Sequence, residues 1–498
     1  MTIAVGDDSI DLAPPRAKDR ALARLHALAA TRGGRLLLVL GFTGLMVGLQ
    51  MGNWWAIAII LALTSAFPQH RRAILVPAAL LFVVLAPPVD FAVLHELGTQ
   101  RGASARAINL GWVAIPIVWA MAFAFLWVVQ NFPKSIVAKR PVTALLAILL
   151  LLILASRTLP IAGSAWVMCA SIQMCFASYI WFFAYWVAEN HNRDKAKPLI
   201  RTGFWRPFWG FTRVPYGKGA AYLERVEAKN DDELAVAQIK GLKLLIWAVV
   251  ITAFIVAVNK LIYRVPHGVS LTELPADSAA AIIPTYQMSL DALRTSEPYS
   301  LPMWWAVLAL YFLMRVAFLT VWGAKIIAVA RMAGFNAFRN TYRPFESPTV
   351  AEYYNRIYYY FKELLVAFFF YPTYLRYFKK WPRVRLFVAT LAAAGLGNWL
   401  FHFLRDQDLI LRHGFWHAAW MYGSYAVYAL VLGVAIGVSQ LRSNARTRAR
   451  CAAPTGWARV RSTAVIMLFF ILICSFNEPN ERHGLGDYAN YCLRLFVP

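Results

Sequence analysis

One stretch near the C-terminal end gathers many of the groups that can do chemistry. Residues Asn398–Trp420, NWLFHFLRDQDLILRHGFWHAAW, hold three of the nine histidines of the chain: His402, His413 and His417. A neutral histidine, with an ordinary pKa of about 6.5, can take the proton of a hydroxyl group and so act as a general base. Ionisable side chains are rare in apolar sequence, since a charge at the centre of a membrane helix costs about 2.5 kcal/mol or more. This stretch is therefore a candidate site.

The three histidines allow different interpretations. His402 is either a general base or a histidine that packs between helices through a hydrogen bond. His413 and His417 stand four residues apart, and we expect them on one face of a helix that begins near Arg412. That spacing can bind a metal, but HGFWH lacks the glutamate of a zinc-protease helix, so we expect no metal. His417 remains the second candidate for the catalytic histidine.

The charged residues around these histidines suit a turn. We expect Asp406 and Asp408 to pair with Arg405, Arg412 or His413. His413 is then an exposed loop residue, and the ion pairs hold the turn at the mouth of the site.

The composition of the chain indicates a membrane protein. Of its 498 residues 60% are hydrophobic and only 15% are charged, whereas soluble domains average about 25% charged residues. The net charge of +25 is explained by basic loops on the cytoplasmic side, which the positive-inside rule favours, and by attraction to anionic lipids. We therefore expect membrane lipids and no nucleic acid as partners. The five cysteines show no metal-binding spacing.

Hydropathy predicts an all-α polytopic protein with about eleven transmembrane helices, since each span needs about 20 apolar residues. The expected spans lie near residues 36–52, 54–69, 73–95, 108–130, 142–157, 162–188, 242–263, 301–331, 385–404, 414–439 and 462–476. We expect a cytoplasmic tail at 1–35, a membrane domain at 36–476 and an external tail at 477–498. Within the membrane domain, 189–241 is a cytoplasmic loop and 264–300 an external loop.

The orientation follows from the basic residues. With the N-terminus in the cytoplasm, the clusters His70–Arg72, Lys134–Arg140, Arg376–Arg385 and Arg442–Arg461 all fall inside, as the positive-inside rule requires. This predicts a multi-pass membrane protein with its N-terminus in the cytoplasm.

The loop 189–241 has two parts. Its first half interleaves aromatic residues with arginines, a pattern that suits the lipid interface. Its second half predicts a helical stretch near 220–240, which the cluster Asn230–Glu233 can cap at its N-terminus.

A second segment, 338–376, contains the apolar run Leu364–Tyr371, which is too short to span and so predicts a re-entrant or interfacial segment. The segment reads Ser347-Pro348-Thr349, then Tyr353-Tyr354-Asn355-Arg356, then Phe370-Tyr371-Pro372, and a histidine follows at His402. In this order and spacing it resembles the membrane-bound O-acyltransferase family, in particular the bacterial branch that acylates cell-surface polymers. Tyr358 stands where the family block ends in a polar residue, and Phe401 and Phe403 flank His402 in place of tryptophan and glycine.

The resemblance implies an enzyme of the bacterial inner membrane that moves an acyl group from a cytoplasmic thioester, on coenzyme A or an acyl-carrier protein, to a hydroxyl of an external glycan, polymer or lipid. It implies no bound cofactor, and a carrier or periplasmic partner protein. His402 would be the base, with His417 in reserve and Asn355 as second active-site residue. Four residues are expected to bind substrate: Arg315, Arg356, Lys362 and Asn398.

Two of these residues carry expectations of their own. Arg315, near the middle of its span, should pair with Glu363 or face a tunnel. Lys362 should meet the phosphates of the donor. In addition, Asn355 or Asn398 can donate a hydrogen bond to a developing oxyanion.

Two other functions remain open: a multi-span transporter or flippase, and a non-catalytic scaffold of the acyltransferase fold that docks a partner protein.

Overall fold

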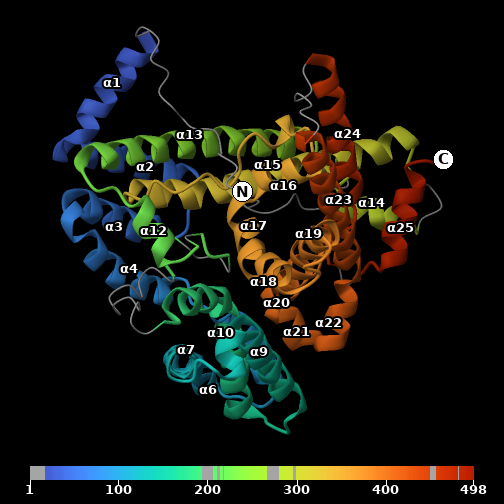
Figure 1. Cartoon of the computed structure of the whole chain (residues 1–498), viewed down its shortest axis with the longest axis horizontal. Helices are drawn as coiled ribbons and strands as arrows, with labels where there is room; N and C mark the ends of the chain where they lie inside the picture. Colours follow the sequence, from blue (N-terminus) through green and yellow to red (C-terminus); the bar gives the residue numbers. More distant parts are fainter. Residues whose placement is uncertain are drawn as a thin grey trace.

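The computed structural model describes residues 17–192, 206–209, 214–216, 218–265, 280–294, 299–448, 456–479 and 482–497. Within these residues the chain forms helices and no strand, apart from an isolated β-bridge between Glu227 and Phe335. In Figure 1 the N-terminal helices lie on the left, the long helices α13 and α15 run across the upper part, α6, α7, α9 and α10 lie at the bottom, and the C-terminal helices lie on the right.

Nine helices in the described residues are long and apolar enough to cross a membrane. They are η1–α4 (Pro68–Leu85), α6–α7 (Ala105–Asn131), α9 (Pro141–Thr158), α10 (Gly163–Asn190), α13 (Asp231–Leu261), α15 (Leu301–Met332), α19–α20 (Pro382–Arg405), α23 (Gly423–Arg448) and α24 (Gly456–Cys474). The expected all-α class with many spans is thus confirmed.

The count of about eleven spans is not reached, and the N-terminal helices explain the difference. Helix α2 (Arg32–Gly48) counts as a tenth span only together with α1 (Ala17–Ala30), from which it is bent by 109°. Helix α3 (Trp54–Ala66) has 13 residues, so it is about 20 Å long. That length falls short of a hydrocarbon core of about 30 Å.

Helix α10 is the most buried of the nine candidate spans. Its most apolar 18-residue window is 83% buried, because aromatic and aliphatic side chains cover it on all sides and neighbouring helices enclose it. The polar Gln173 in its middle donates to Gln407 at 2.7 Å and accepts from Ser156 at 2.6 Å. This buried network ties α9, α10 and α21 (Gln407–His413) together, as side-chain hydrogen bonds do between membrane helices.

Helices α13 and α15 form the long antiparallel pair of Figure 1. They approach closely at Gly241, where an added Cβ would lie 2.9 Å from the carbonyl oxygen of Ala328. Helix α13 begins where the sequence predicts, since the side chain of Asn230 caps it by accepting from the Glu233 N–H at 2.8 Å. Small residues at such contacts let two backbones come together.

The loop 189–241 is described only in part. Residues 193–205, 210–213 and 217 lie outside the described residues. The expected helical stretch near 220–240 is divided into α12 (Ala220–Val226) and the start of α13. The expected interfacial position is wrong for Phe208 and Trp209, which are fully buried. Trp209 packs against Phe335 with ring centroids 5.2 Å apart, so these aromatic residues belong to the core.

The segment Tyr359–Arg376 is a continuous helix: α17 (Tyr359–Leu365), the π-helical turn η6 (Val366–Phe370) and α18 (Tyr371–Arg376). It packs antiparallel against α19 (Pro382–Thr390), the π-helical segment η7 (Leu391–Gly397) and α20 (Asn398–Arg405). The apolar run 364–371 thus lies inside a helical hairpin, and the segment is not one of the nine candidate spans. Its re-entrant character stays a prediction.

The π-helical segment η7 sets the position of the helix that carries His402. An added Cβ at Gly397 would lie 2.7 Å from the ring of Phe369, and one at Gly433 would lie 2.9 Å from the backbone nitrogen of Gly395. Glycines are therefore required where η7 packs between η6 and α23. Single π-helical turns inside α-helices are frequent at functional sites, because they change the direction in which the following side chains point.

The C-terminal tail is folded rather than extended. Helix α25 (Leu485–Arg494) packs on α14 (Tyr286–Ala292), the described helix of the 264–300 loop. Arg294 bonds to Asp487 at 2.9 Å, and Tyr286 packs edge-on against Tyr491 with centroids 5.0 Å apart. The predicted external loop and external tail therefore lie together.

Candidate active site

A cavity of about 580 Å³ lies between α15, α16 (Val350–Ile357), α17, α20, α23 and α24. Most of its wall is aromatic and aliphatic. The polar and charged residues that line it are Arg315, Lys325, Tyr353, Tyr354, Tyr358, Asn398, His402, Arg405, Tyr425, Tyr428 and Asn477. Pockets of this size, mostly apolar with a few polar groups, are typical of sites for small molecules.

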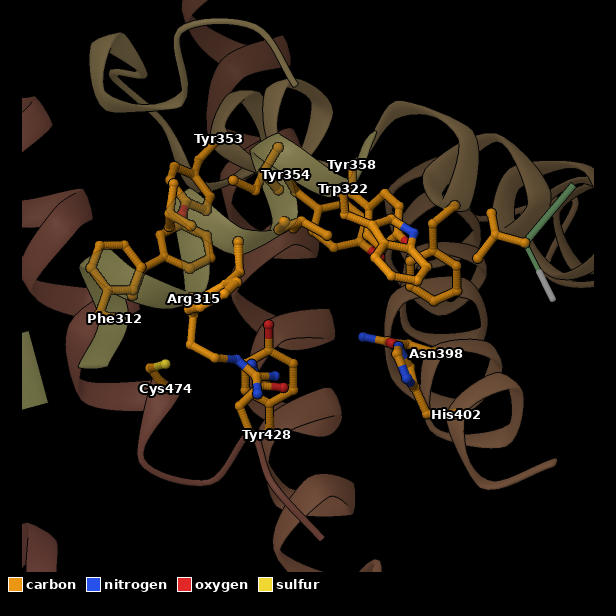
Figure 2. Close-up of a pocket in the computed structure, with 18 of the residues that line it drawn as sticks. Phe312, Arg315, Trp322, Tyr353, Tyr354, Tyr358, Asn398, His402, Tyr428 and Cys474 are labelled. Carbon is orange, nitrogen blue, oxygen red and sulfur yellow. The ribbon is translucent and has the colours of Figure 1, made fainter. Parts of the chain in front are cut away.

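The structure brings three of the predicted site residues together in this cavity: Arg315, Asn398 and His402. Figure 2 shows Arg315 extending into the cavity from one wall, while Asn398 and His402 project from the opposite wall. Asn398 and His402 stand one helical turn apart on α20, so they share a face of that helix. Their proposed chemical roles stay predictions.

The other four predicted site residues do not line the cavity. Asn355 is half-buried in α16. Arg356 forms an ion pair with Glu352 on its own helix, and Lys362 contacts Glu363 at 2.8 Å. His417 lies on α22 (Phe415–Met421) and is exposed. None of these four is therefore placed beside His402.

His402 sits among aromatic rings. Its ring lies 4.8 Å from the ring of Tyr425 and 5.3 Å from that of Phe361, measured between centroids. Within the described residues no side chain or backbone group is hydrogen-bonded to its ring nitrogens. The helix-packing interpretation required such a bond, so the ring is instead available to a molecule in the cavity.

The amide of Asn398 is oriented by Tyr425. Asn398 is only 2% exposed. Its Oδ1 accepts a hydrogen bond from the Tyr425 hydroxyl at 3.0 Å. Since an amide offers one acceptor oxygen and two N–H donors, this bond leaves the NH2 group as the free end. Asn398 can therefore donate to an oxygen atom beside His402.

A network of hydrogen bonds to the carboxylate of Asp406 holds the C-terminal end of α20. Arg405 donates to Asp406 through Nε at 2.6 Å and Nη2 at 2.9 Å, and the Tyr422 hydroxyl also bonds to this carboxylate. Burial alone would raise the pKa of Asp406, but the bonds from Arg405 and Tyr422 hold it below its ordinary value. The expected pairing of Asp406 with Arg405 is confirmed.

Other expected pairs differ from the structure. Arg315 bonds to Glu478 at 2.8 Å, not to Glu363. Glu363 instead accepts from Lys218 and Lys362; burial opposes its ionisation, but these two ammonium groups lower the pKa of the carboxyl. Glu478 follows the last span, and its backbone oxygen is fixed by Ser424 at 2.9 Å. Its position was not predictable from local sequence.

The helix expected to carry both His413 and His417 is interrupted. Helix α21 ends at His413, and Gly414 adopts a φ of +85°, a conformation that glycine reaches without steric cost. The two rings nevertheless lie 5.5 Å apart. His413 is half-buried rather than exposed, and Arg412 pairs with Glu96 rather than with an aspartate of the turn.

The structure adds cavity residues that sequence reasoning did not select. Arg405 lines the cavity from α20, and Tyr425 and Tyr428 line it from α23. A signal for Arg405 existed: Asn398, His402 and Arg405 follow the i, i+4, i+7 spacing of one helical face. Tyr425 and Tyr428 stand three residues apart in the same way. Tyr358 also lines the cavity, with its hydroxyl 3.4 Å from that of Tyr216.

Comparison with known proteins assigns no relative. The chain matches no family model, and no curated protein matches it.

Proposed function

We propose that the protein is a membrane O-acyltransferase of a bacterial inner membrane. The observation that supports this most is the cavity in which a histidine with free ring nitrogens lies one helical turn from an asparagine whose amide nitrogen is free. Acyl transfer to a hydroxyl needs a base, a donor for the oxyanion and a site that holds both substrates in place.

In this proposal His402 takes the proton of the acceptor hydroxyl as its oxygen attacks the carbonyl carbon of the thioester. Asn398 donates to the oxyanion that forms on that carbonyl oxygen. The carbon–sulfur bond then breaks, the ester is released, and the thiolate leaves and takes up the proton from His402. The donor is acyl-coenzyme A or an acyl-carrier protein, and the acceptor is an extracytoplasmic glycan, polymer or lipid.

The proposed orientation places the N-terminus in the cytoplasm. Ion pairs support the division of the segments between the two sides of the membrane, and the basic loops are the reason to place one side in the cytoplasm. Segments expected inside bond to each other, as Arg72 does to Glu227 at 2.9 Å. Segments expected outside do likewise, as Arg294 does to Asp487 at 2.9 Å.

Single cysteines test this orientation after the native cysteines are replaced. Thr158→Cys should react with an impermeant thiol reagent in intact cells, and Lys380→Cys should react only after lysis. Both positions are exposed in the structure. The residues of the loop between 266 and 279 lie outside the described residues, so these two positions are better probes. The opposite labelling pattern would reverse the orientation.

Metabolic labelling tests the proposed activity without knowledge of the acyl group. Cells that express the wild-type chain are grown with radioactive acetate, and alkali-labile label is measured in purified envelope polymers and lipids. His402→Gln, at matched protein level, should incorporate no more label than cells without the protein. Equal incorporation by wild type and His402→Gln would contradict the proposal, as would the absence of any wild-type signal.

A further inference from the structure

The cavity has an unbalanced charge. Three cationic side chains line it, Arg315, Lys325 and Arg405, and among the described residues no aspartate or glutamate does. Asp406 and Glu478 pair with the two arginines, and neither of these acidic residues lines the cavity. A ligand inside the cavity therefore meets positive charge without a competing carboxylate at the surface.

Arg315 keeps most of its hydrogen-bond capacity. An arginine carries five N–H donors, and the bond to Glu478 uses Nη1 alone. The side chain of Arg315 is 31% exposed, and its guanidinium atoms are not among the buried polar atoms without a partner. The remaining N–H groups therefore face open space, and Figure 2 shows the guanidinium extending into the cavity.

Arg405 is similarly placed on the opposite helix. Asp406 occupies its Nε and Nη2 at 2.6 and 2.9 Å, which leaves Nη1 without a bond within the described residues. Its side chain is 38% exposed. Both arginines line the same cavity as His402. Lys325 is separate, because ten residues of α15, or about 15 Å, lie between it and Arg315.

We propose that Arg315 and Arg405 form an anion site beside His402, which binds a carboxylate or a phosphate group of an organic ligand. Guanidinium groups match these anions geometrically, because two parallel N–H donors meet two oxygens. That this ligand is the acyl acceptor rests on the proposed function. The acceptor then presents its hydroxyl to His402 while its carboxylate or phosphate group is held by the arginines.

The rest of the wall suits such a ligand. Tyr425 and Tyr428 line the cavity near the arginines. Tyrosine rings pack on the apolar face of a sugar.

Binding is measured with four small probes on the full chain in nanodiscs of phosphatidylcholine. Glucuronate is compared with glucose, and glycerol 3-phosphate with glycerol, by calorimetric titration. At least one acid should bind about tenfold or more tightly than its neutral partner, since hydrogen bonds to charged groups are the strong ones. The acid that binds distinguishes a uronate from a phosphate as the natural group.

The matched variants are two pairs of neutral substitutions. Arg315→Gln with Glu478→Gln removes an arginine of the cavity together with its partner, so no carboxylate is left unpaired. Arg412→Gln with Glu96→Gln removes a similar pair outside the cavity. The first should weaken acid binding about tenfold or more, and the second should change it less than twofold. Arg405→Lys keeps the positive charge beside Asp406 but removes the paired N–H donors of the guanidinium group. It should also weaken acid binding.

The inference fails if neither acid binds more tightly than its neutral partner, or if the Arg315/Glu478 variant binds as well as the Arg412/Glu96 control. Should the double variant not fold, Arg405→Lys with wild-type binding overturns it. These results are separate from the proposed function. If the acid binds but no acyl transfer is detected in the labelling experiment, the anion site is supported and the proposed function is contradicted. If acyl transfer occurs but the acid binds no more tightly than its neutral partner, only the anion site is contradicted.

Discussion

The two histidine groups of Asn398–Trp420 occupy very different surroundings. His402 lines a cavity enclosed by helices from four parts of the chain. His417 is exposed, next to Trp420 with ring centroids 5.7 Å apart. Both histidines stand in aromatic sequence within one turn of an asparagine or another histidine. The difference therefore arises from what packs opposite each helix, and the local sequence does not contain that information.

Replacing each of the two histidines by glutamine tests this contrast most strongly. His402→Gln keeps the size and polarity of the side chain but removes the base, so acyl transfer should fall by about a hundredfold or more. His417→Gln, on an exposed surface, should leave the rate within about twofold. The measurement is alkali-labile acyl label per amount of protein in membranes. A full loss with His417→Gln and activity with His402→Gln would place the base on α22.

The orientation of Asn398 gives the next largest effect. Tyr425→Phe removes the hydroxyl that holds the Asn398 amide, and we expect the rate to fall about tenfold, because a bond of about 1.4 kcal/mol is worth that factor. Tyr286→Phe is the matched control. It removes a buried hydroxyl that donates to the Ser475 carbonyl at 2.7 Å, and neither Tyr286 nor Ser475 lines the cavity.

The two variants are distinguished by measuring rate and thermal stability together. Tyr286→Phe should lower the melting temperature and keep the rate per folded molecule. Tyr425→Phe should lower the rate more than its melting temperature explains. Equal loss of rate in both would mean that Tyr425 acts only through stability.

The sequence predicted the class of the fold and one side of the site. Long apolar runs predict helices directly, because their length is fixed by the bilayer. Asn398 and His402 were selected as site residues, and the structure places both on one face of α20 at the cavity. Arg315 was selected because a charged side chain in the middle of a membrane helix is costly and usually has a function.

The errors have a common physical origin. Glu478 reaches Arg315 from beyond the last span, and Lys218 reaches Glu363 across more than a hundred residues. Such pairs depend on how distant helices pack, which a single sequence does not state. Trp209 shows the same limit, since aromatic residues beside arginines are typical of a lipid interface, yet the contact with Phe335 buries it.

The network around Asp406 gives a smaller, pH-dependent effect on stability. The folded protein lowers the pKa of Asp406, so its paired carboxylate stabilises the fold fully above the ordinary value of about 3.9. This contribution is lost as the pH falls through the lowered pKa. Asp406→Asn should therefore lower the melting temperature at pH 7, and the gap to wild type should close below about pH 4. A gap that is constant with pH would show that the charge of Asp406 is not what stabilises the end of α20.

The smallest effect is expected at the other arginine of the same turn. Arg412 bonds to Glu96 through Nη2 at 2.8 Å, and the Glu96 side chain is 49% exposed. Exposed ion pairs contribute little, because water screens the charges and two long side chains lose freedom in forming them. Arg412→Gln should thus change neither the rate nor the melting temperature measurably, although Arg412 lies only seven residues from Arg405. If Arg412→Gln lowers the rate as much as Tyr425→Phe does, the exposed turn and the cavity wall act as one unit, and the contrast between the two histidine groups is lost.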